Sequence, residues 1–311
     1  MYKSVIIGAG PSGLNAAVNL ARSGLKPLVI KGFEPSNHLV STLEVEYFPG
    51  FPHEMKATDL LDNMFKQAEN FGAEFRFGRV SSVDLSKRPF VLTVDGQEQV
   101  IAETIIIATG AKAEHLGIPG ENEYLGRGIG TCAPCNGFSF RNKHVIVIGG
   151  GDAAMEEVEY LSQYTSNVTV VHRSDKFRAS KHLLNRVREK NLKWMLNRTP
   201  LEVLGDDRGV SGLKVINHKS GKEEVIPAGG IYVAIGKKPN SQFLDGQLPM
   251  DSLGYLLVKP GMTETEIPGV FACGDVQDRV YSNLITAVGS GYMAASDCER
   301  FLDSIEENWR M

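Results

Sequence analysis

The chain opens with an apolar run that leads directly into a glycine turn, Ser4-Val5-Ile6-Ile7-Gly8-Ala9-Gly10-Pro11-Ser12-Gly13. The run predicts a strand over residues 4–7, and the composition of residues 14–21 predicts a helix that Gly24 caps. Glycines in such a turn permit a tight bend, close approach of the backbone to a pyrophosphate, and close packing of helix on strand. The helix N-terminus supplies N–H donors for the phosphates. This stretch therefore predicts a dinucleotide-binding βαβ unit.

The next strand, expected over residues 27–30, supports this interpretation. An acidic residue usually binds the ribose at the end of that strand, but Lys31 stands there. Glu34 lies three residues further on and is the expected ribose ligand.

A second unit of the same kind begins with an apolar strand over residues 144–148 and the turn Gly149-Gly150-Gly151-Asp152-Ala153-Ala154. A helix ending at Leu161 and a strand over 168–171 follow. Two such units predict two nucleotide sites, with a domain boundary near residues 115–118. The third strand is followed by His172-Arg173-Ser174-Asp175-Lys176-Phe177-Arg178. These cations are placed to meet a ribose 2′-phosphate, which favours NADP(H), although a solvated surface loop is the alternative.

The remaining segments complete an α/β prediction of two doubly wound nucleotide-binding domains. A helix is expected over residues 59–71, and a buried parallel strand over 104–108 ends at Thr109 and Gly110. A small antiparallel β layer in the first domain is expected from four short alternating segments, 73–77, 79–84, 90–94 and 99–102. A strand over 229–236 closes the second domain, and a last helix over about 282–302 packs on the first. The predicted domains are 1–115 with 240–311, and 116–239.

The segment Thr131-Cys132-Ala133-Pro134-Cys135-Asn136-Gly137 carries two thiols two residues apart. This spacing brings the sulfurs within bonding reach once a helical turn forms, and a helix N-terminus favours the thiolate. A zinc site is the alternative, but zinc needs four ligands and the other cysteines, Cys273 and Cys298, are solitary. We therefore predict a redox-active pair and assign Cys273 and Cys298 to the core, without a redox role.

Composition excludes several other classes of protein. The 311 residues are 42% hydrophobic, with a formal net charge of -4 and scattered lysines and arginines, so neither nucleic acid nor a membrane is an expected partner. No targeting segment is recognised at the start, and four cysteines favour a reducing compartment. Cytoplasm is the expected location.

The order of these motifs resembles the low-molecular-weight thioredoxin reductase family of FAD- and NAD(P)-linked disulfide oxidoreductases, over nearly the whole chain. The resemblance is specific because the dithiol immediately precedes the second nucleotide motif. It implies FAD in the first domain, NADPH and the dithiol in the second, thioredoxin or a thioredoxin-like protein as acceptor, and a homodimer. It also implies a rotation between domains, with hinges at 115–118 and 236–240.

The resemblance implies three sets of site residues. The redox pair is Cys132 and Cys135, with Cys135 nearer the flavin and Asn136 at the position of the family's acid. The expected FAD residues are Gly8, Gly10, Pro11, Ser12, Gly13, Glu34, Asn37, His38, Leu39, Tyr47, Val80, Ala108, Thr109, Gly110, Gly274, Asp275, Leu284 and Ile285. The expected NADPH residues are Gly149, Gly151, Asp152, His172, Arg173 and Arg178.

Departures from the family pattern make the chain a divergent member. They are Ser36-Asn37-His38 near the flavin, Tyr47, Asn136, Ser174 in place of an arginine, and Ser282-Asn283-Leu284. We expect poor use of NADPH from these changes. The alternatives are reduction by ferredoxin or another flavin donor, a small-molecule dithiol oxidase, and a non-catalytic flavin scaffold, against which the intact cysteine pair argues. Residues 303–311 are expected beyond the last helix, with Trp309 either in a loose end or over a cofactor pocket.

Overall fold

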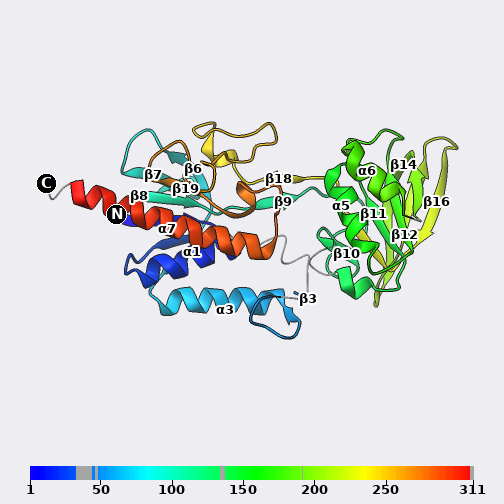
Figure 1. Cartoon of the computed structure of the whole chain (residues 1–311), viewed down its shortest axis with the longest axis horizontal. Helices are drawn as coiled ribbons and strands as arrows, with labels where there is room; N and C mark the ends of the chain where they lie inside the picture. Colours follow the sequence, from blue (N-terminus) through cyan, green and yellow to red (C-terminus); the bar gives the residue numbers. More distant parts are fainter. Residues whose placement is uncertain (33–43, 46–47, 134–136, 191, 309–311) are drawn as a thin grey trace. The chain divides into compact units, whose positions relative to one another are not determined.

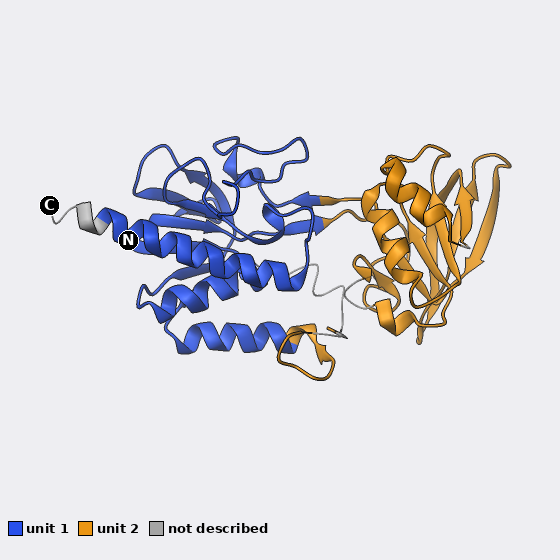
Figure 2. Ribbon diagram, in the orientation of Figure 1, with its two compact units in different colours: residues 1–36, 59–112, 238–311 blue, residues 37–58, 113–237 orange. Residues whose placement is uncertain are grey.

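The computed structural model describes residues 1–32, 44–45, 48–133, 137–190 and 192–308 (Figure 1). The chain divides into two compact units (Figure 2). The first unit contains residues 1–36, 59–112 and 238–311, and the second contains 37–58 and 113–237. This division differs from the predicted domains mainly at residues 37–58, which the prediction allotted to the first.

The first unit is built on a seven-stranded mixed sheet. Its strands are β1 (Tyr2–Ile7), β2 (Leu28–Lys31), β5 (Glu74–Phe77), β6 (Val80–Asp84), β7 (Phe90–Val94), β8 (Glu98–Ile107) and β19 (Val270–Ala272). The order is β5-β2-β1-β8-β7-β6, and β19 also pairs with β8. The pairs β5–β2, β2–β1, β1–β8 and β8–β19 are parallel, whereas β6 and β7 form the antiparallel part.

Two of the strand predictions in this sheet are wrong in detail. Residues 73–77 do not join the antiparallel part, because β5 pairs in parallel with β2. The segments 99–102 and 104–108 form the single strand β8, whose first half pairs with β7 and whose second half pairs with β19. Thr104 does not interrupt that strand, because its buried hydroxyl donates a hydrogen bond to the Lys3 carbonyl at 2.7 Å. The predicted fold class is confirmed.

Successive side chains of a strand point to opposite faces of the sheet, and the parallel strands of this sheet place apolar side chains on both faces. Val5 and Ile7 belong to one buried cluster with the β6–β7 strands, and Ile6 belongs to another with the helices. The helices of this unit are α1 (Pro11–Arg22), α3 (Ala57–Asn70) and α7 (Leu284–Asn308). Helices α1 and α7 lie side by side (Figure 1). Helix α7 continues six residues beyond its predicted end at 302, and Trp309 lies outside the described residues.

The second unit repeats the plan with a five-stranded parallel sheet in the order β10-β17-β11-β12-β13. These strands are β10 (Ile129–Gly130), β11 (Val145–Ile148), β12 (Val168–His172), β13 (Lys193–Leu196) and β17 (Gly230–Val233). The unit's helices are α5 (Asp152–Leu161) and α6 (Lys181–Arg188). A three-stranded antiparallel sheet, which the sequence analysis missed, comprises β14 (Arg198–Asp206), β15 (Gly209–Asn217) and β16 (Lys222–Pro227).

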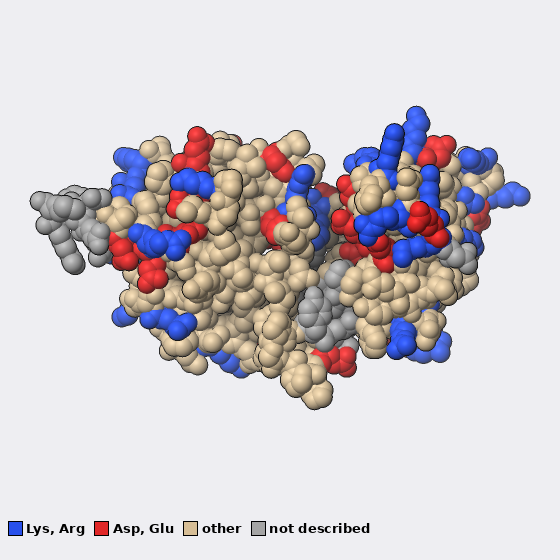
Figure 3. Space-filling model, viewed as in Figure 1, with Lys and Arg blue, Asp and Glu red and all other residues tan. Residues whose placement is uncertain are grey.

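The two segments that connect the units pair with each other as a two-stranded sheet of β9 (Ala111–Ala113) and β18 (Lys237–Pro239). The remaining elements of the described residues are β3 (Glu44–Val45), β4 (Met55–Lys56) and three short 3-10 helices, Gly137–Phe140, Gln242–Leu244 and Gly274–Val276. No helix in the described part of the chain has the length and apolarity needed to span a membrane. On the face drawn in Figure 3, acidic and basic side chains are interspersed on each unit.

Candidate functional site

The first glycine turn connects β1 to α1, and two of its glycines are required by close packing. Gly8 has φ of +110°, and a Cβ added there would lie 2.4 Å from the Ala108 carbonyl oxygen. A Cβ added at Gly13 would lie 2.0 Å from the Gly8 carbonyl oxygen. Both positions exclude a side chain because the atoms that would be struck belong to the backbone.

Gly10 differs from these two glycines because its surroundings are open. No atom lies within 4 Å of a Cβ placed there. Gly10 is also the N-cap of α1 and provides no side-chain acceptor, and Pro11 occupies the first turn. The first-turn amides are therefore left for water or a ligand, which suits the phosphates of a dinucleotide. The residues present fit the FAD that the sequence analysis expects.

Two other segments that the sequence analysis assigned to the flavin lie near this turn because three parallel strands end together. Ile7, Ile107 and Ala272 are in register across β1, β8 and β19. The residues that follow these strand ends, Ala108-Thr109-Gly110 and Gly274-Asp275, therefore lie at one edge of the sheet. In open α/β sheets ligands bind at this carboxyl edge.

Gly274 is tied closely to the first glycine turn. Its φ is +71°, and a Cβ there would lie 2.5 Å from the Ser12 hydroxyl oxygen. Its N–H donates to the Ser290 hydroxyl at 2.9 Å, which links it to α7. The neighbouring Asp275 carboxylate accepts a hydrogen bond from the Ser282 hydroxyl at 2.7 Å. Ser282, one of the departures from the family pattern, thus fixes a carboxylate at the predicted cofactor edge.

Asn240 is a residue of this edge that the sequence analysis missed. Its side-chain amide donates to the Thr109 carbonyl at 2.9 Å, and the Thr109 hydroxyl donates to the Asn240 carbonyl at 2.8 Å. Its backbone N–H donates to the Gly110 carbonyl at 3.0 Å. Asn240 thereby holds the Thr109-Gly110 bend, and no local pattern in the sequence signals a pairing across 131 positions.

The remaining flavin residues from the sequence analysis fall into three groups. Leu284 and Ile285 open α7, where the Asn283 side chain accepts the Ile285 N–H at 3.0 Å. Val80 packs in the buried cluster of the sheet, so only its backbone is available to a ligand. Five others lie outside the described residues: Glu34, Asn37, His38, Leu39 and Tyr47.

The second glycine turn connects β11 to α5 and is closed by backbone at Gly149 and by a side chain at Gly150. A Cβ at Gly149, whose φ is +153°, would lie 2.3 Å from the Ala234 carbonyl oxygen. A Cβ at Gly150 would lie 2.3 Å from Cε1 of His172. Gly151 is open and caps α5 without a side-chain acceptor, as Gly10 does for α1. This turn is therefore also suited to a dinucleotide phosphate.

The loop after β12 folds back on this turn through its backbone. The N–H groups of Arg178 and Ala179 donate to the Gly150 carbonyl at 2.8 and 3.1 Å. The His172 ring stacks on Phe177 with centroids 5.1 Å apart. The N–H of Ser180 donates to the carboxylate of Asp152 at 2.6 Å.

Ser174 shapes this loop from within, because its hydroxyl donates to the Lys176 carbonyl at 2.9 Å. The Nε2–H of His172 donates to the same carbonyl at 3.0 Å. The side chains of Arg173 and Arg178 are exposed. The structure thus brings His172 and the backbone of Arg178 to the turn that contains Gly149, Gly151 and Asp152, and Arg173 follows His172 in the chain.

Cys132 is disulfide-bonded, and the backbone beside it is held by α5. The Ala133 N–H donates to a carboxylate oxygen of Glu157 at 2.5 Å. Burial raises the pKa of Glu157 to about 7. Glu157 was missed because a glutamate in a helix resembles an ordinary surface residue. Cys135 and Asn136 lie outside the described residues.

Cys273 and Cys298 are free thiols in the core of the first unit. Burial raises the pKa of Cys273 to about 12 and that of Cys298 to about 11. Neither thiol forms an appreciable thiolate near neutral pH.

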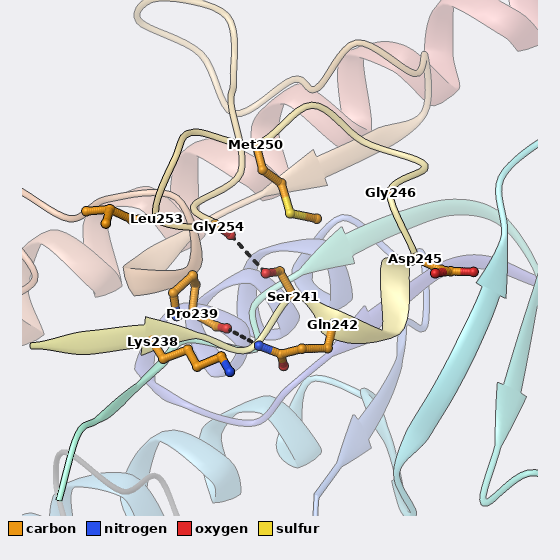
Figure 4. Close-up of a pocket in the computed structure, with 9 residues that line it drawn as sticks. All are labelled: Lys238, Pro239, Ser241, Gln242, Asp245, Gly246, Met250, Leu253 and Gly254. Atoms are coloured by element: carbon orange, nitrogen blue, oxygen red, sulfur yellow. Dashed lines mark hydrogen bonds between the residues drawn. The ribbon is translucent and has the colours of Figure 1, made fainter.

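A separate pocket of about 250 Å³ in the first unit is lined by residues of the segment 238–254 and contains no residue of the two glycine turns and no cysteine. Figure 4 shows two of its polar side chains, Ser241 and Gln242, hydrogen-bonded within the pocket wall. The Ser241 hydroxyl donates to the Gly254 carbonyl at 2.8 Å, and the Gln242 amide donates to the Pro239 carbonyl at 2.9 Å.

Comparison with known proteins agrees with this organisation. Residues 2–291 match the family model for pyridine nucleotide-disulphide oxidoreductases. The chain is 45% identical over 310 residues to the thioredoxin reductase of Vibrio cholerae, covering 97% of each chain. It is 43% identical over 314 residues to that of Escherichia coli O157:H7, covering 98% of this chain and 97% of the relative.

A solved structure agrees in fold as well as in sequence. The thioredoxin reductase of Giardia duodenalis superimposes with a TM-score of 0.92 at 39% identity, covering 97% of this chain and 98% of that one. With two dinucleotide-type turns and a disulfide at Cys132 in one chain, these relationships show that the protein belongs to the pyridine nucleotide-disulphide oxidoreductase family and, within it, to the low-molecular-weight thioredoxin reductases.

Proposed function

We propose that this flavin-dependent oxidoreductase passes electrons from NADPH through FAD to a disulfide between Cys132 and Cys135, and on to thioredoxin or a thioredoxin-like protein. It acts as a homodimer in the cytoplasm. The first unit holds FAD, and the second holds NADPH and the dithiol. The observation that carries the proposal is a disulfide-bonded Cys132 in the same unit as a second, open glycine turn.

The residues of the first unit bind and orient the flavin nucleotide. Gly10 and the first turn of α1 receive its pyrophosphate, and Thr109-Gly110, held by Asn240, line the same edge. The flavin, when bound, supplies a carrier that accepts two electrons from a nicotinamide and passes them to a disulfide. The residues of the chain position that carrier.

In the second unit, one set of residues binds the electron donor, and the cysteine pair passes the electrons to the acceptor. Arg173 and Arg178 bind the 2′-phosphate of NADPH, while Gly151 admits its pyrophosphate. Ser174 provides no third guanidinium, so NADPH binds less tightly than with an arginine there. The reduced pair then exchanges with the acceptor's disulfide through a mixed disulfide, in which one thiol attacks and the other resolves.

Anaerobic bleaching of the flavin tests the donor directly. The purified protein is mixed in a stopped-flow instrument with NADPH, NADH or a reduced ferredoxin system. We expect NADPH to bleach the flavin at a rate that supports turnover. Bleaching by ferredoxin alone would instead assign the chain to a branch of the family independent of pyridine nucleotides.

Replacing each cysteine tests the dithiol. Cys132→Ser and Cys135→Ser are each expected to abolish NADPH-driven reduction of thioredoxin while flavin stays bound, because exchange needs both thiols. The matched control is Cys298→Ser, because the Cys298 thiol is fully buried. Substantial turnover in Cys135→Ser would refute the assignment of the redox pair.

A further inference from the structure

The acid position that follows the second cysteine holds Asn136, an amide that does not exchange a proton near neutral pH. The second unit nevertheless contains a carboxyl group at the other end of the same motif. Glu157 lies on α5, and one of its oxygens accepts the N–H of Ala133, the residue after Cys132. Its chemistry has no part in the function proposed above.

Helix α5 supports the redox motif at both of its ends. Ala133 is fully buried in the cluster that includes Ala154 and Val158 of this helix. Gly137, which follows the motif, is so close to α5 that a Cβ there would lie 3.1 Å from the Tyr160 ring. Glu157 and Tyr160 are one turn apart, so one side of α5 meets both ends. The contact of Glu157 with Ala133 is therefore part of a fixed support.

The charges around Glu157 leave burial as the dominant influence on its proton. Lys237 lowers and Glu156 raises the pKa of this carboxyl, but both effects are smaller than desolvation. Among the elements packed against α5, β11 and the 3-10 helix Gly137–Phe140 carry no titratable side chain, and His172 of β12 is bonded to Lys176. On α6, Arg186 pairs with Glu159 rather than Glu157, and the other titratable residues, Lys181, His182 and Arg188, are exposed.

We propose that Glu157 is a positioning residue for the redox pair, which anchors the backbone beside Cys132 through Ala133 and exchanges a proton in step with the disulfide. This role rests on the proposed function, in which the pair is reduced by two electrons from the flavin. Those electrons break the sulfur–sulfur bond and leave two sulfur anions. One anion takes a proton from solvent and becomes a thiol, and the other remains a thiolate.

A thiolate at Cys132 and an ionised Glu157 carboxylate repel each other, because Glu157 contacts the residue next to Cys132. Formation of the thiolate therefore favours the neutral carboxyl, and Glu157 takes up the second proton from solvent. Reoxidation forms the disulfide again, removes the thiolate charge, and returns that proton to solvent. Conversely, an ionised Glu157 raises the pKa of the thiol and slows its reactions as a nucleophile.

The experiment compares the flavin-loaded protein with Glu157→Gln after reduction by dithiothreitol and removal of the reductant under anaerobic conditions. The rate of alkylation of Cys132 by iodoacetamide is followed by mass spectrometry from pH 5.5 to 9. The amide keeps an acceptor for the Ala133 N–H but carries no charge. We expect the wild-type profile to contain an inflection from Glu157 that the variant lacks, at or above pH 7 because the thiolate of the reduced pair favours the neutral carboxyl. At pH 8 the variant should react about tenfold faster, the factor for one unit of thiol pKa.

Glu156→Gln is the matched control, because it removes the same charge from the neighbouring exposed position without touching Ala133. Its profile should keep the inflection, at a slightly lower pH because the Glu156 charge raises the pKa of Glu157. Glu157→Asp retains a titrating carboxyl and should retain an inflection, which keeps the test valid if the amide variant is unstable. Identical profiles for wild type and Glu157→Gln, or an equal change in Glu156→Gln, would overturn the role of Glu157.

A chemical reductant separates this result from the proposed function. Suppose that Glu157→Gln changes the alkylation profile but NADPH, NADH and ferredoxin all fail to reduce the pair. The coupling between the Glu157 proton and the Cys132 thiol is then supported, and the proposed electron path is refuted. If the electron path works and the two profiles coincide, only the coupling is refuted. The midpoint potential of the pair gives a second readout: its dependence on pH should change slope near pH 7 in wild type and not in Glu157→Gln.

Discussion

The two glycine turns have the same plan but are closed by different parts of the chain. In the first, Gly13 meets the Gly8 carbonyl, and Gly291 of α7 would place a Cβ 2.1 Å from the Ser12 carbonyl oxygen. The first turn is therefore enclosed by backbone from three segments. In the second, Gly149 also meets backbone, at the Ala234 carbonyl oxygen, but the atoms that would meet a Cβ at Gly150 belong to the His172 side chain. Backbone cannot move aside without unfolding strands, whereas a ring can rotate, so the second turn is the more adaptable at Gly150.

The largest expected effect is from Gly13→Ala in the first turn. A Cβ 2.0 Å from a carbonyl oxygen forces α1 away from β1, and we expect destabilisation of about 3 kcal/mol or more, with loss of flavin. Thermal unfolding and flavin absorbance measure both quantities.

The matched control is Gly10→Ala, because that position is open. This variant should fold with nearly the wild-type melting temperature and bind flavin more weakly, since the added methyl group occupies the ligand's space. Equal stability of the two variants would show that the backbone packing around Gly13 does not control the fold.

The next effect is expected from Gly150→Ala in the second turn. The new methyl group displaces the His172 ring, and we expect a loss of about 2 kcal/mol and weaker NADPH binding, with flavin retained. The double variant Gly150→Ala/His172→Ala should recover much of the stability, because it removes the side chain that clashes. Double-mutant analysis of the unfolding free energies checks this coupling; simple additivity of the two losses would contradict it.

The turns also show which features of the structure could be predicted from the sequence. Both glycine turns were predicted with their strands and helices, because the motif and the apolar run are contiguous. Asn240 and Glu157 were not predicted, since each contacts a segment distant in the chain: Thr109 and Ala133 respectively. The direction of β5 was wrong because four alternating residues do not encode a partner. The antiparallel sheet of β14, β15 and β16 was missed for a similar reason, as its strands include several half-buried residues that blur the alternation.

A smaller effect is expected from the exposed cations that distinguish the second turn. Arg178→Ala should raise the KM for NADPH by about tenfold, corresponding to a lost charge-assisted contact of about 1.5 kcal/mol. NADH, which lacks the 2′-phosphate, should be unaffected, and steady-state kinetics with both nucleotides makes the comparison. Ser174→Arg tests the same site in the opposite direction and should lower the KM for NADPH. Equal losses with NADH and NADPH would show that Arg178 shapes the loop instead of binding the phosphate.

The smallest effect concerns Cys298, a buried thiol of the first unit, which contrasts with Cys132 in the second unit. Cys298 is enclosed by Thr104 and Ser4, with its sulfur 3.1 Å from the Thr104 hydroxyl oxygen. Because burial raises its pKa to about 11, the thiol stays protonated at pH 8, and iodoacetamide should leave it unmodified until the protein unfolds. Cys298→Ala should cost only about 1 kcal/mol, from the small cavity it leaves, with turnover unchanged. Labelling of Cys298 in the folded protein at the rate of reduced Cys132 would mean that the first unit opens far more readily than its backbone-enclosed turn implies.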